Sequence, residues 1–405
     1  MMRLHRLLLG LFLLVPALVL GPGVAAQPLD DPIAELPADQ RPRWSGIDAR
    51  AYSGPVPESP GSVISVKALD PVLVPAGAST AYRVLYATTD LRGNPAVSTA
   101  AIYLPAGEPP PGGWRSLAHA HGTFGLGDHC APSARLLPDA LSAAYTMLLD
   151  EGYAVIVSDY QGLGTPGEHA YLHGPTAARN VLDSVRAARG LDLPITEEWA
   201  VLGHSQGGQV ALHVEHEARA MAPGLLPEFR GAVAIAPGVN VASLAPLVTP
   251  ELPGVLPAGV STFGVLIVAA MDTAYPDLSV SEALTPLGAE ALEVARTRCT
   301  KPVSNLLEGS MARDLLVRPL TDVPGATAAA DEYLRTPVRG YEHPVLIVQG
   351  LADTAVPAPL VLAFAAELAS NGEFAELHIE PEADHLTVLE SSRAVVLEFL
   401  DSAWS

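Results

Sequence analysis

Short apolar runs alternate with helical patterns along most of this 405-residue chain. The runs have the length and the bounding turn residues of strands, and they fall at 81–88, 98–104, 114–121, 153–160, 199–203, 231–236, 343–349 and 374–379. Apolar residues recur at helical spacing at 134–150, 176–190, 206–222, 358–370 and 391–400. The first two runs predict a hairpin. The later alternation predicts a mostly parallel central sheet flanked by helices, an α/β fold.

One long connection interrupts this alternation. Residues 241–340 separate two predicted strands, and a connection of about one hundred residues is too long for a bare loop. It contains many prolines and helical pieces at 262–271 and 281–298. We therefore expect a helical cap or lid, residues 241–340, inserted into a core formed by residues 61–240 and 341–405.

The N-terminus has the features of a secretory signal peptide. Arg3 and Arg6 precede an apolar run at 7–20, and small residues follow up to Ala26. The prediction is a signal peptide over residues 1–26, cleaved near Ala26, and a secreted protein in an extracellular or periplasmic space.

No stable membrane anchor is expected. The first apolar run is short for a bilayer span and contains Pro16, and the nearest later apolar stretch, 260–271, is shorter still. Residues 27–60 contain many Pro, Asp and Glu residues without periodicity, which predicts an extended, exposed N-terminal leader.

The formal net charge of −21 argues against a nucleic-acid partner, because the chain would repel phosphates. The two cysteines, Cys130 and Cys299, are expected to form a disulfide after export into an oxidising space. Two buried free thiols are the alternative.

The most informative motif is Gly-His-Ser-Gln-Gly at 203–207, between an apolar run and a helical pattern. A strand, a tight turn and a helix around a central serine are typical of a nucleophile elbow. Gly203 and Gly207 suit the crowded backbone of such a turn, which exposes the hydroxyl of Ser205. His204 is expected to leave the elbow on another face and to belong to the scaffold.

A serine hydroxyl needs a histidine base and a carboxylate that orients the histidine. After an elbow the chain order is serine, acid, histidine. Asp353 follows the strand at 343–349, and His385 follows the last strand. Asp384 is an alternative acid, but neighbouring loop side chains usually diverge, so Asp353 is preferred.

The oxyanion hole of such a site takes one N–H from the residue after the nucleophile, here Gln206, and one from the loop after an earlier strand. That loop reads His121-Gly122-Thr123. Thr123 is our second donor and Gly122 its close rival; alternatively, the glycines of this loop only form a turn.

No metal or other cofactor is expected. His119 and His121 alternate along a strand, and no Cys or carboxylate completes a ligand set with them. Asp159, which follows another strand, is expected to brace a loop rather than take part in the reaction.

Four motifs taken together resemble the secretory lipases, the lipase A-like branch of the α/β-hydrolase superfamily. They are His-Gly-Thr at 121–123, Asp-Tyr-Gln-Gly-Leu-Gly at 159–164, Gly-His-Ser-Gln-Gly-Gly at 203–208 and Ala-Asp-His at 383–385. The resemblance implies an α/β-hydrolase fold with a cap before the acid-bearing strand, and acyl-ester hydrolysis. Ser205, Asp353 and His385 match the family's triad by position.

We therefore expect a secreted serine carboxylic-ester hydrolase, a lipase or esterase, that acts on small-molecule or lipid esters through an acyl-enzyme. An apolar cap favours hydrophobic esters and transient contact with a lipid interface. The same triad would also serve an acyltransferase or a serine peptidase. A non-catalytic binding module that keeps the fold alone is the remaining alternative.

Overall fold

The computed structural model describes residues 33, 36–37 and 40–405. The predicted signal peptide, residues 1–26, and its cleavage site lie outside the described residues, as does the first part of the predicted leader.

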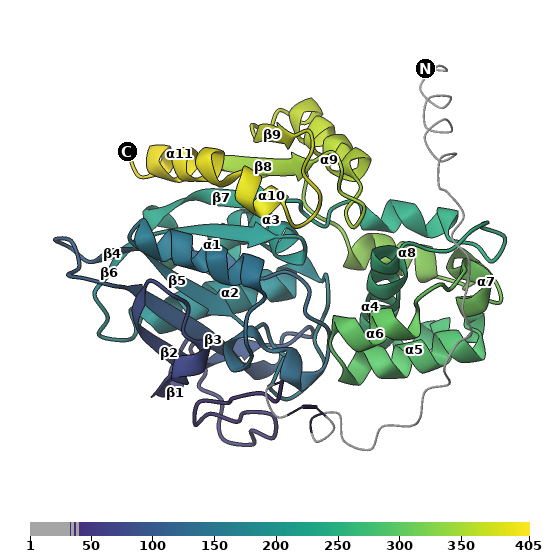
Figure 1. The fold of residues 1–405 in the computed structure, drawn as a ribbon, viewed down its shortest axis with the longest axis horizontal. Coiled ribbons are helices and arrows are strands. Elements are labelled where there is room, and N and C mark those ends of the chain that lie inside the picture. Colours follow the sequence, from purple (N-terminus) through teal and green to yellow (C-terminus); the bar gives the residue numbers. More distant parts are fainter. Residues whose placement is uncertain (1–32, 34–35, 38–39) are drawn as a thin grey trace. The chain divides into compact units, whose positions relative to one another are not determined.

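The described residues form a nine-stranded sheet in the order β1-β2-β3-β5-β4-β6-β7-β8-β9. Its strands are β1 Val63–Ala68, β2 Ala78–Thr89, β3 Pro95–Pro105, β4 Trp114–Ala120, β5 Tyr153–Ser158, β6 Ile195–His204, β7 Phe229–Ile235, β8 Val345–Gly350 and β9 Glu376–Glu380. The pairs β1–β2, β2–β3 and β3–β5 are antiparallel, and every later pair is parallel. The predicted hairpin and the predicted parallel remainder are both confirmed (Figure 1).

Helices cover both faces of the sheet, because each central strand buries side chains on both sides. One face packs against α1 Asp139–Asp150, α10 Val388–Ser391 and α11 Arg393–Ala403. The other packs against α2 Gly174–Arg189, α3 Gln206–Met221 and α9 Ala358–Ser370. Along β6 the faces alternate with period two: Ala200 and Leu202 belong to the first core, and Val201 to the second.

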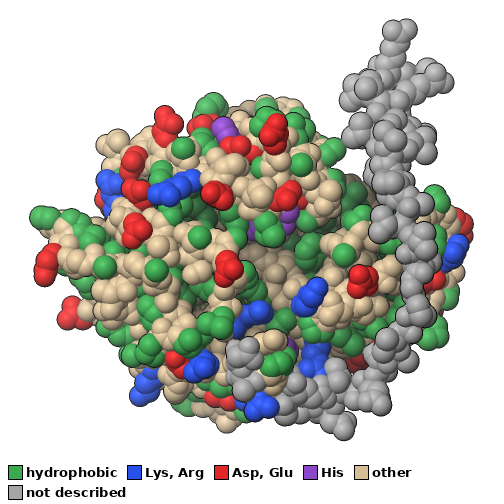
Figure 2. Space-filling view, viewed as in Figure 1, with side chains coloured by type: hydrophobic (Ala, Val, Ile, Leu, Met, Phe, Trp, Pro, Cys, Tyr) green, Lys and Arg blue, Asp and Glu red, His purple; other side chains and the backbone are tan. Residues whose placement is uncertain are grey.

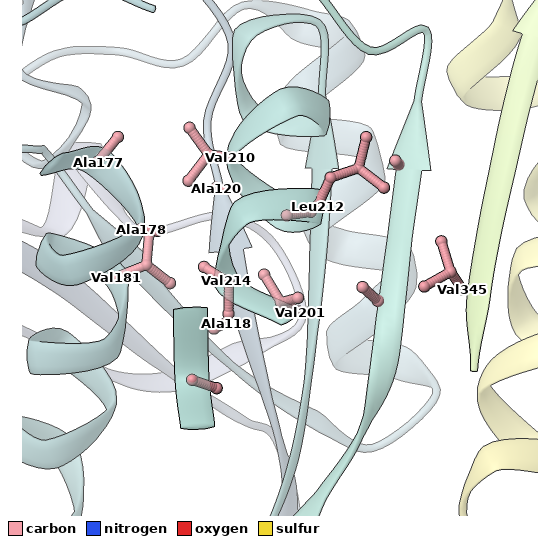
Figure 3. Packing of buried hydrophobic residues seen from close by; sticks show 14 of the residues in the cluster. Ala118, Ala120, Ala177, Ala178, Val181, Val201, Val210, Leu212, Val214 and Val345 are labelled. Carbon is pink, nitrogen blue, oxygen red and sulfur yellow. The ribbon is translucent and has the colours of Figure 1, made fainter. Parts of the chain in front are cut away.

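Small side chains let α2 and α3 lie close to the sheet. Figure 3 shows Ala118 and Val201 from the strands near Val181 and Val214 of the helices, and all four side chains are buried. This packing fixes the start of α3, which matters because the elbow serine precedes it.

Between β7 and β8 the chain forms a helical insertion with a core of its own, drawn in green beside the sheet in Figure 1. Its α-helices are α4 Ala258–Ala274, α5 Pro286–Thr297, α6 Thr300–Leu306, α7 Ala312–Leu315 and α8 Ala326–Tyr333. Its short 3-10 helices are η6 Val241–Leu247, η7 Pro276–Leu278, η8 Val280–Ala283 and η9 Leu320–Asp322. The 3-10 helices outside it are η2 Pro71–Leu73, η3 Asp128–Cys130, η4 Pro132–Ala134 and η5 Pro223–Glu228.

The expected helix at 281–298 is divided into η8 and α5. Pro286 occupies the first turn of α5, where its missing N–H costs nothing, and the Thr285 hydroxyl accepts a hydrogen bond from the Gly288 N–H at 3.1 Å. This N-cap starts a new helix where the apolar spacing alone indicates a continuous one.

The later part of the predicted leader differs from an exposed segment. Ile47 and Ala49 are buried with Leu85 and Val97 of β2 and β3. This stretch consists of turns, so it packs on the sheet without the periodicity that marks a strand or a helix in a sequence.

In the described part of the chain no single helix is both long and apolar enough to cross a bilayer. The bent pair Ala258–Ala274 and Pro276–Ala283, which meet at 107°, passes that test together by length and composition only. Acidic and basic side chains are both scattered over the face drawn in Figure 2.

Candidate active site

Ser205 occupies a sharp turn between the end of β6 and the start of α3. Its backbone has φ 59° and ψ −119°, a conformation that L-residues rarely adopt. The Ser205 N–H donates to Ile235 O at 2.9 Å, which ties the turn to β7.

Two glycines make this turn possible by close backbone contact. A Cβ at Gly203 would lie 1.9 Å from Gly207 O, and one at Gly207 would lie 1.8 Å from Ala120 O. Any larger residue would push α3 away from β4 and β6. The turn is therefore the strand-turn-helix elbow expected from the sequence motif.

Asp353 and His385 meet at the same edge of the sheet. Asp353 follows β8 and is buried, and its Oδ2 lies 2.7 Å from His385 Nδ1. Its other oxygen, Oδ1, accepts from the N–H groups of Ala355 at 2.8 Å and Val356 at 2.9 Å. The carboxylate is thus held from two sides, and with Nδ1 as donor a neutral His385 has Nε2 as its acceptor.

Asp384 does not face the imidazole of His385. Its Oδ1 accepts from the N–H groups of Leu386 at 2.9 Å and Thr387 at 2.8 Å. The Thr387 and Leu386 N–H groups lower the pKa of this exposed carboxyl. Asp384 therefore shapes the turn that carries His385, while Asp353 contacts the ring.

Ser205 lies near this pair, although among the described residues no hydrogen bond joins its Oγ to His385. The neighbouring His204 ring has its centroid 4.6 Å from the His385 ring. Catalytic hydrogen bonds are often long without a substrate and tighten when one binds. The elbow, the acid and the histidine thus meet at the carboxyl edge of β6 and β8.

The loop at 121–125, which we call the oxyanion loop after the role predicted for it, passes beside the elbow. A Cβ at Gly122 would lie 3.6 Å from Ser205 Cβ. Gly122 O lies 2.7 Å from His121 Nδ1, and Thr123 Oγ1 lies 2.8 Å from the hydroxyl of Tyr171. In the described part of the chain the backbone N–H groups of Thr123 and Gln206 have no backbone acceptor.

Gln206 is held by a residue that sequence analysis missed. Its Nε2 lies 3.0 Å from His169 Nε2, and His169 Nδ1 lies 3.3 Å from Gln161 O. Burial, with a smaller effect from His121, lowers the pKa of His169 to about 3, so its ring is neutral and accepts from the amide. His169 and Tyr171 belong to no recognised motif, so only the fold brings them to the site.

Asp159 is buried in a network behind the oxyanion loop. Its Oδ1 accepts from the Ser133 N–H at 2.8 Å, and its Oδ2 accepts from the Thr99 hydroxyl at 2.5 Å. The fully buried Arg83 lies 4.0 Å from Oδ2. Asp159 O also lies 3.1 Å from His121 Nε2, so this residue braces the loop.

The predicted disulfide between Cys130 and Cys299 is confirmed, with Cα atoms 5.5 Å apart. Cys130 ends η3 of the core, and Cys299 is the N-cap of α6 in the insertion. Next to the bond, the Thr300 N–H donates to Phe124 O at 2.9 Å. His129 lies near both sulfurs, but these sulfurs are bonded to each other and cannot act as thiolate ligands.

A cavity of about 220 Å³ opens at the elbow and extends into the insertion. Ser205, Gln206 and Tyr171 contribute to its lining on the core side. The insertion contributes mostly apolar side chains, among them Phe263, Ile267, Met271, Leu292 and Leu316. Such a cavity suits an apolar group placed next to the Ser205 hydroxyl.

The fold and the elbow define an α/β-hydrolase. Residues 140–405 match the model of the secretory lipase family, and the chain belongs to that family. This confirms the resemblance found in the sequence motifs.

Individual relatives are distant. The chain is 26% identical over 341 residues to a protein of Mycobacterium tuberculosis named a probable inactive lipase, covering 79% of this chain and 73% of that protein. It is 28% identical over 215 residues to the secreted triacylglycerol lipase LIP3 of Malassezia restricta, covering 46% of this chain and 42% of that protein.

Solved structures share the fold. Candida antarctica lipase A in its closed state aligns with a TM-score of 0.69 at 20% identity, covering 85% of this chain and 82% of that one. The rice cell wall degrading esterase LipA of Xanthomonas oryzae aligns with a TM-score of 0.70 at 19% identity, covering 85% and 100%.

Proposed function

We propose that this protein is a secreted serine carboxylic-ester hydrolase that cleaves acyl esters through an acyl-enzyme on Ser205. The observation that carries the proposal is the 2.7 Å contact between His385 Nδ1 and Asp353 Oδ2 at the same edge of the sheet as Ser205, which itself lines an apolar cavity. Membership of the secretory lipase family and the disulfide support export.

In the first half of the reaction the Ser205 hydroxyl attacks the ester carbonyl carbon while His385 Nε2 takes its proton. Asp353 stabilises the imidazolium without becoming protonated. The N–H groups of Gln206 and Thr123 stabilise the negative oxygen of the tetrahedral intermediate. His385 then gives the proton to the leaving alcohol, and the acyl group stays on Ser205.

In the second half, water gives a proton to His385 and attacks the acyl-enzyme, and the acid leaves as Ser205 regains its proton. The apolar cavity supports an acyl group with a hydrocarbon chain, because each methylene transferred from water contributes about 0.8 kcal/mol. Residues 241–340 act in this proposal as the cap that supplies the acyl-binding wall.

The test is a series of p-nitrophenyl esters of increasing acyl length, with emulsified triglyceride as a further substrate. We expect turnover on several esters and covalent labelling of Ser205 by a fluorophosphonate. Ser205→Ala should lower kcat by about 10⁴- to 10⁶-fold. A relative of this chain is named a probable inactive lipase, so activity has to be measured for wild type and Ser205→Ala side by side. Equal turnover by wild type and Ser205→Ala would refute the proposal, as would a wild type that is neither active nor labelled.

A further inference from the structure

We propose that His204, the residue before the elbow serine, is a positioning residue that holds the main chain of His385 in place. The inference rests on the proposed function, in which His385 is the general base. It also replaces the expectation from sequence that His204 leaves the elbow on another face and belongs to the scaffold.

The contact is direct. His204 Nε2 lies 2.7 Å from His385 O, and the two ring planes meet at 43°. A carbonyl oxygen only accepts hydrogen bonds, so Nε2 of His204 carries the proton and donates it. The bond joins the end of β6 to the loop after β9, across the ends of β7 and β8, which lie between these strands in the sheet.

The loop after β9 needs such a tether because the residues on either side of His385 are mostly exposed. Glu382, Asp384 and Leu386 around it are exposed. The loop is attached to the core by a hydrogen bond from the Ala352 N–H to Ala383 O at 3.1 Å. At residue 385, Asp353 fixes the angle of the ring through Nδ1, and His204 fixes the backbone from which the ring projects.

His204 can hold this bond while His385 changes its charge. Burial, aided by the neighbouring His385, lowers the pKa of His204 to about 3. His204 therefore stays neutral near neutral pH, and it brings no second positive charge beside His385 when that residue takes a proton from Ser205.

The test compares His204→Phe, which keeps a buried planar ring without the donor, with His204→Gln, whose Nε2–H can reach the carbonyl. We expect His204→Phe to lower kcat on p-nitrophenyl butyrate by about 10- to 100-fold, with KM within about twofold, because a catalytic group displaced by about 1 Å loses that much. Phosphonylation of Ser205 by a fluorophosphonate should slow by the same factor. His204→Gln should recover most of both rates.

A readout independent of turnover is the downfield proton signal of the Asp353–His385 hydrogen bond, which should broaden or move in His204→Phe and return in His204→Gln. The matched control is His378→Gln, at a half-exposed histidine of β9 whose Nε2 lies 2.9 Å from Glu380 Oε1. It should leave all three measurements unchanged.

If His204→Phe does not fold, the test can instead compare His204→Asn with His204→Gln. The shorter asparagine amide does not reach His385 O, whereas the glutamine amide does. Unchanged kcat, labelling and proton signal in His204→Phe, or in His204→Asn, would overturn the inference. Loss of kcat with an unmoved proton signal would also overturn it. A wild type that is not labelled at Ser205 would instead refute the proposed function, and the inference with it.

Discussion

The carboxyl edge of the sheet and the helical insertion meet at one cavity but are built in opposite ways. At the edge the backbone of the elbow is tightly packed, because a side chain at Gly203 or Gly207 would overlap neighbouring backbone atoms. In the insertion, Gly264 lines the cavity in the middle of α4, with no heavy atom within 4 Å of a built Cβ. Reacting groups therefore need a fixed frame, whereas the wall of a binding cavity can vary without disturbing that frame.

The largest loss of activity should come from a change to the Asp353 carboxylate at the edge of the sheet. Asp353→Asn should lower kcat by about 10⁴-fold, because an amide favours the wrong tautomer of His385. Asp384→Asn is the matched control. Its amide oxygen can still accept from Leu386 and Thr387, so esterase activity should stay within about twofold. Steady-state kinetics on one ester measures both; equal losses would remove the assignment of Asp353.

The disulfide joins the two regions, so its removal shows how much this covalent link contributes to the free energy of unfolding. It closes a loop of 169 residues, and the chain-entropy model gives a loss of about 5 kcal/mol in the free energy of unfolding for Cys130→Ser with Cys299→Ser. Urea denaturation under non-reducing conditions measures this loss. An unfolding free energy equal to that of wild type would show that the contacts beside the bond suffice.

One pair of substitutions tests the contrast between the regions directly. Gly207→Ala should lower the free energy of unfolding by about 3 kcal/mol or more, because its Cβ would overlap Ala120 O. Gly264→Ala should raise it by about 0.5–1 kcal/mol, because open space receives the methyl group and the helix loses less entropy on folding. Thermal and urea unfolding measure both, and a destabilised Gly264→Ala would contradict the contrast.

The last prediction concerns the stability of the protein in acid. Burial lowers the pKa of His119, His169, His204 and His213 to about 3, and all four lie in the core, while residues 241–340 contain no histidine. The unfolded chain, with histidine pKa values near 6.5, binds protons that the folded core excludes. These groups contribute stability that is present above about pH 6.5 and is lost as the pH falls towards 3.

Each buried histidine should lower the free energy of unfolding by about 1.4 kcal/mol per pH unit in that window. Urea unfolding at pH 7.5, 6.5, 5.5 and 4.5 measures the slope. His213→Leu removes one titrating group and should reduce the slope by about 1.4 kcal/mol per pH unit. A free energy of unfolding that does not change between pH 7.5 and 5.5 would contradict the burial of neutral histidines.

Much of the core could be predicted from sequence because its strands and helices each follow one periodicity. The run at 199–203 and the helical pattern at 206–222 locate the elbow to within a residue. The start of the last strand was predicted less accurately. The predicted run includes Phe374, which is 85% exposed, whereas β9 begins at Glu376. An exposed aromatic residue next to a strand cannot be told from a buried one by its letter alone.

The parts of the site that chain order defines were predictable, and those that three-dimensional contact defines were not. Asp353 and His385 follow strands in the order typical of the fold, and the structure brings them into hydrogen-bond contact. The contact of His204 with His385 joins residues 181 positions apart. His169 reaches Gln206 through a loop without periodicity. The cavity wall combines helices of the insertion, so its shape depends on packing that no local pattern records.

The attachment of the oxyanion loop to α6 matters for anyone who wishes to exchange the insertion for that of a relative. Phe124 receives its hydrogen bond from Thr300, beside the cystine that anchors the same two segments. A transplanted module that lacks these partners would leave one donor of the proposed oxyanion hole unsupported, even with every catalytic side chain retained. Chimaeras should therefore exchange the module together with the 124–130 segment of the same parent.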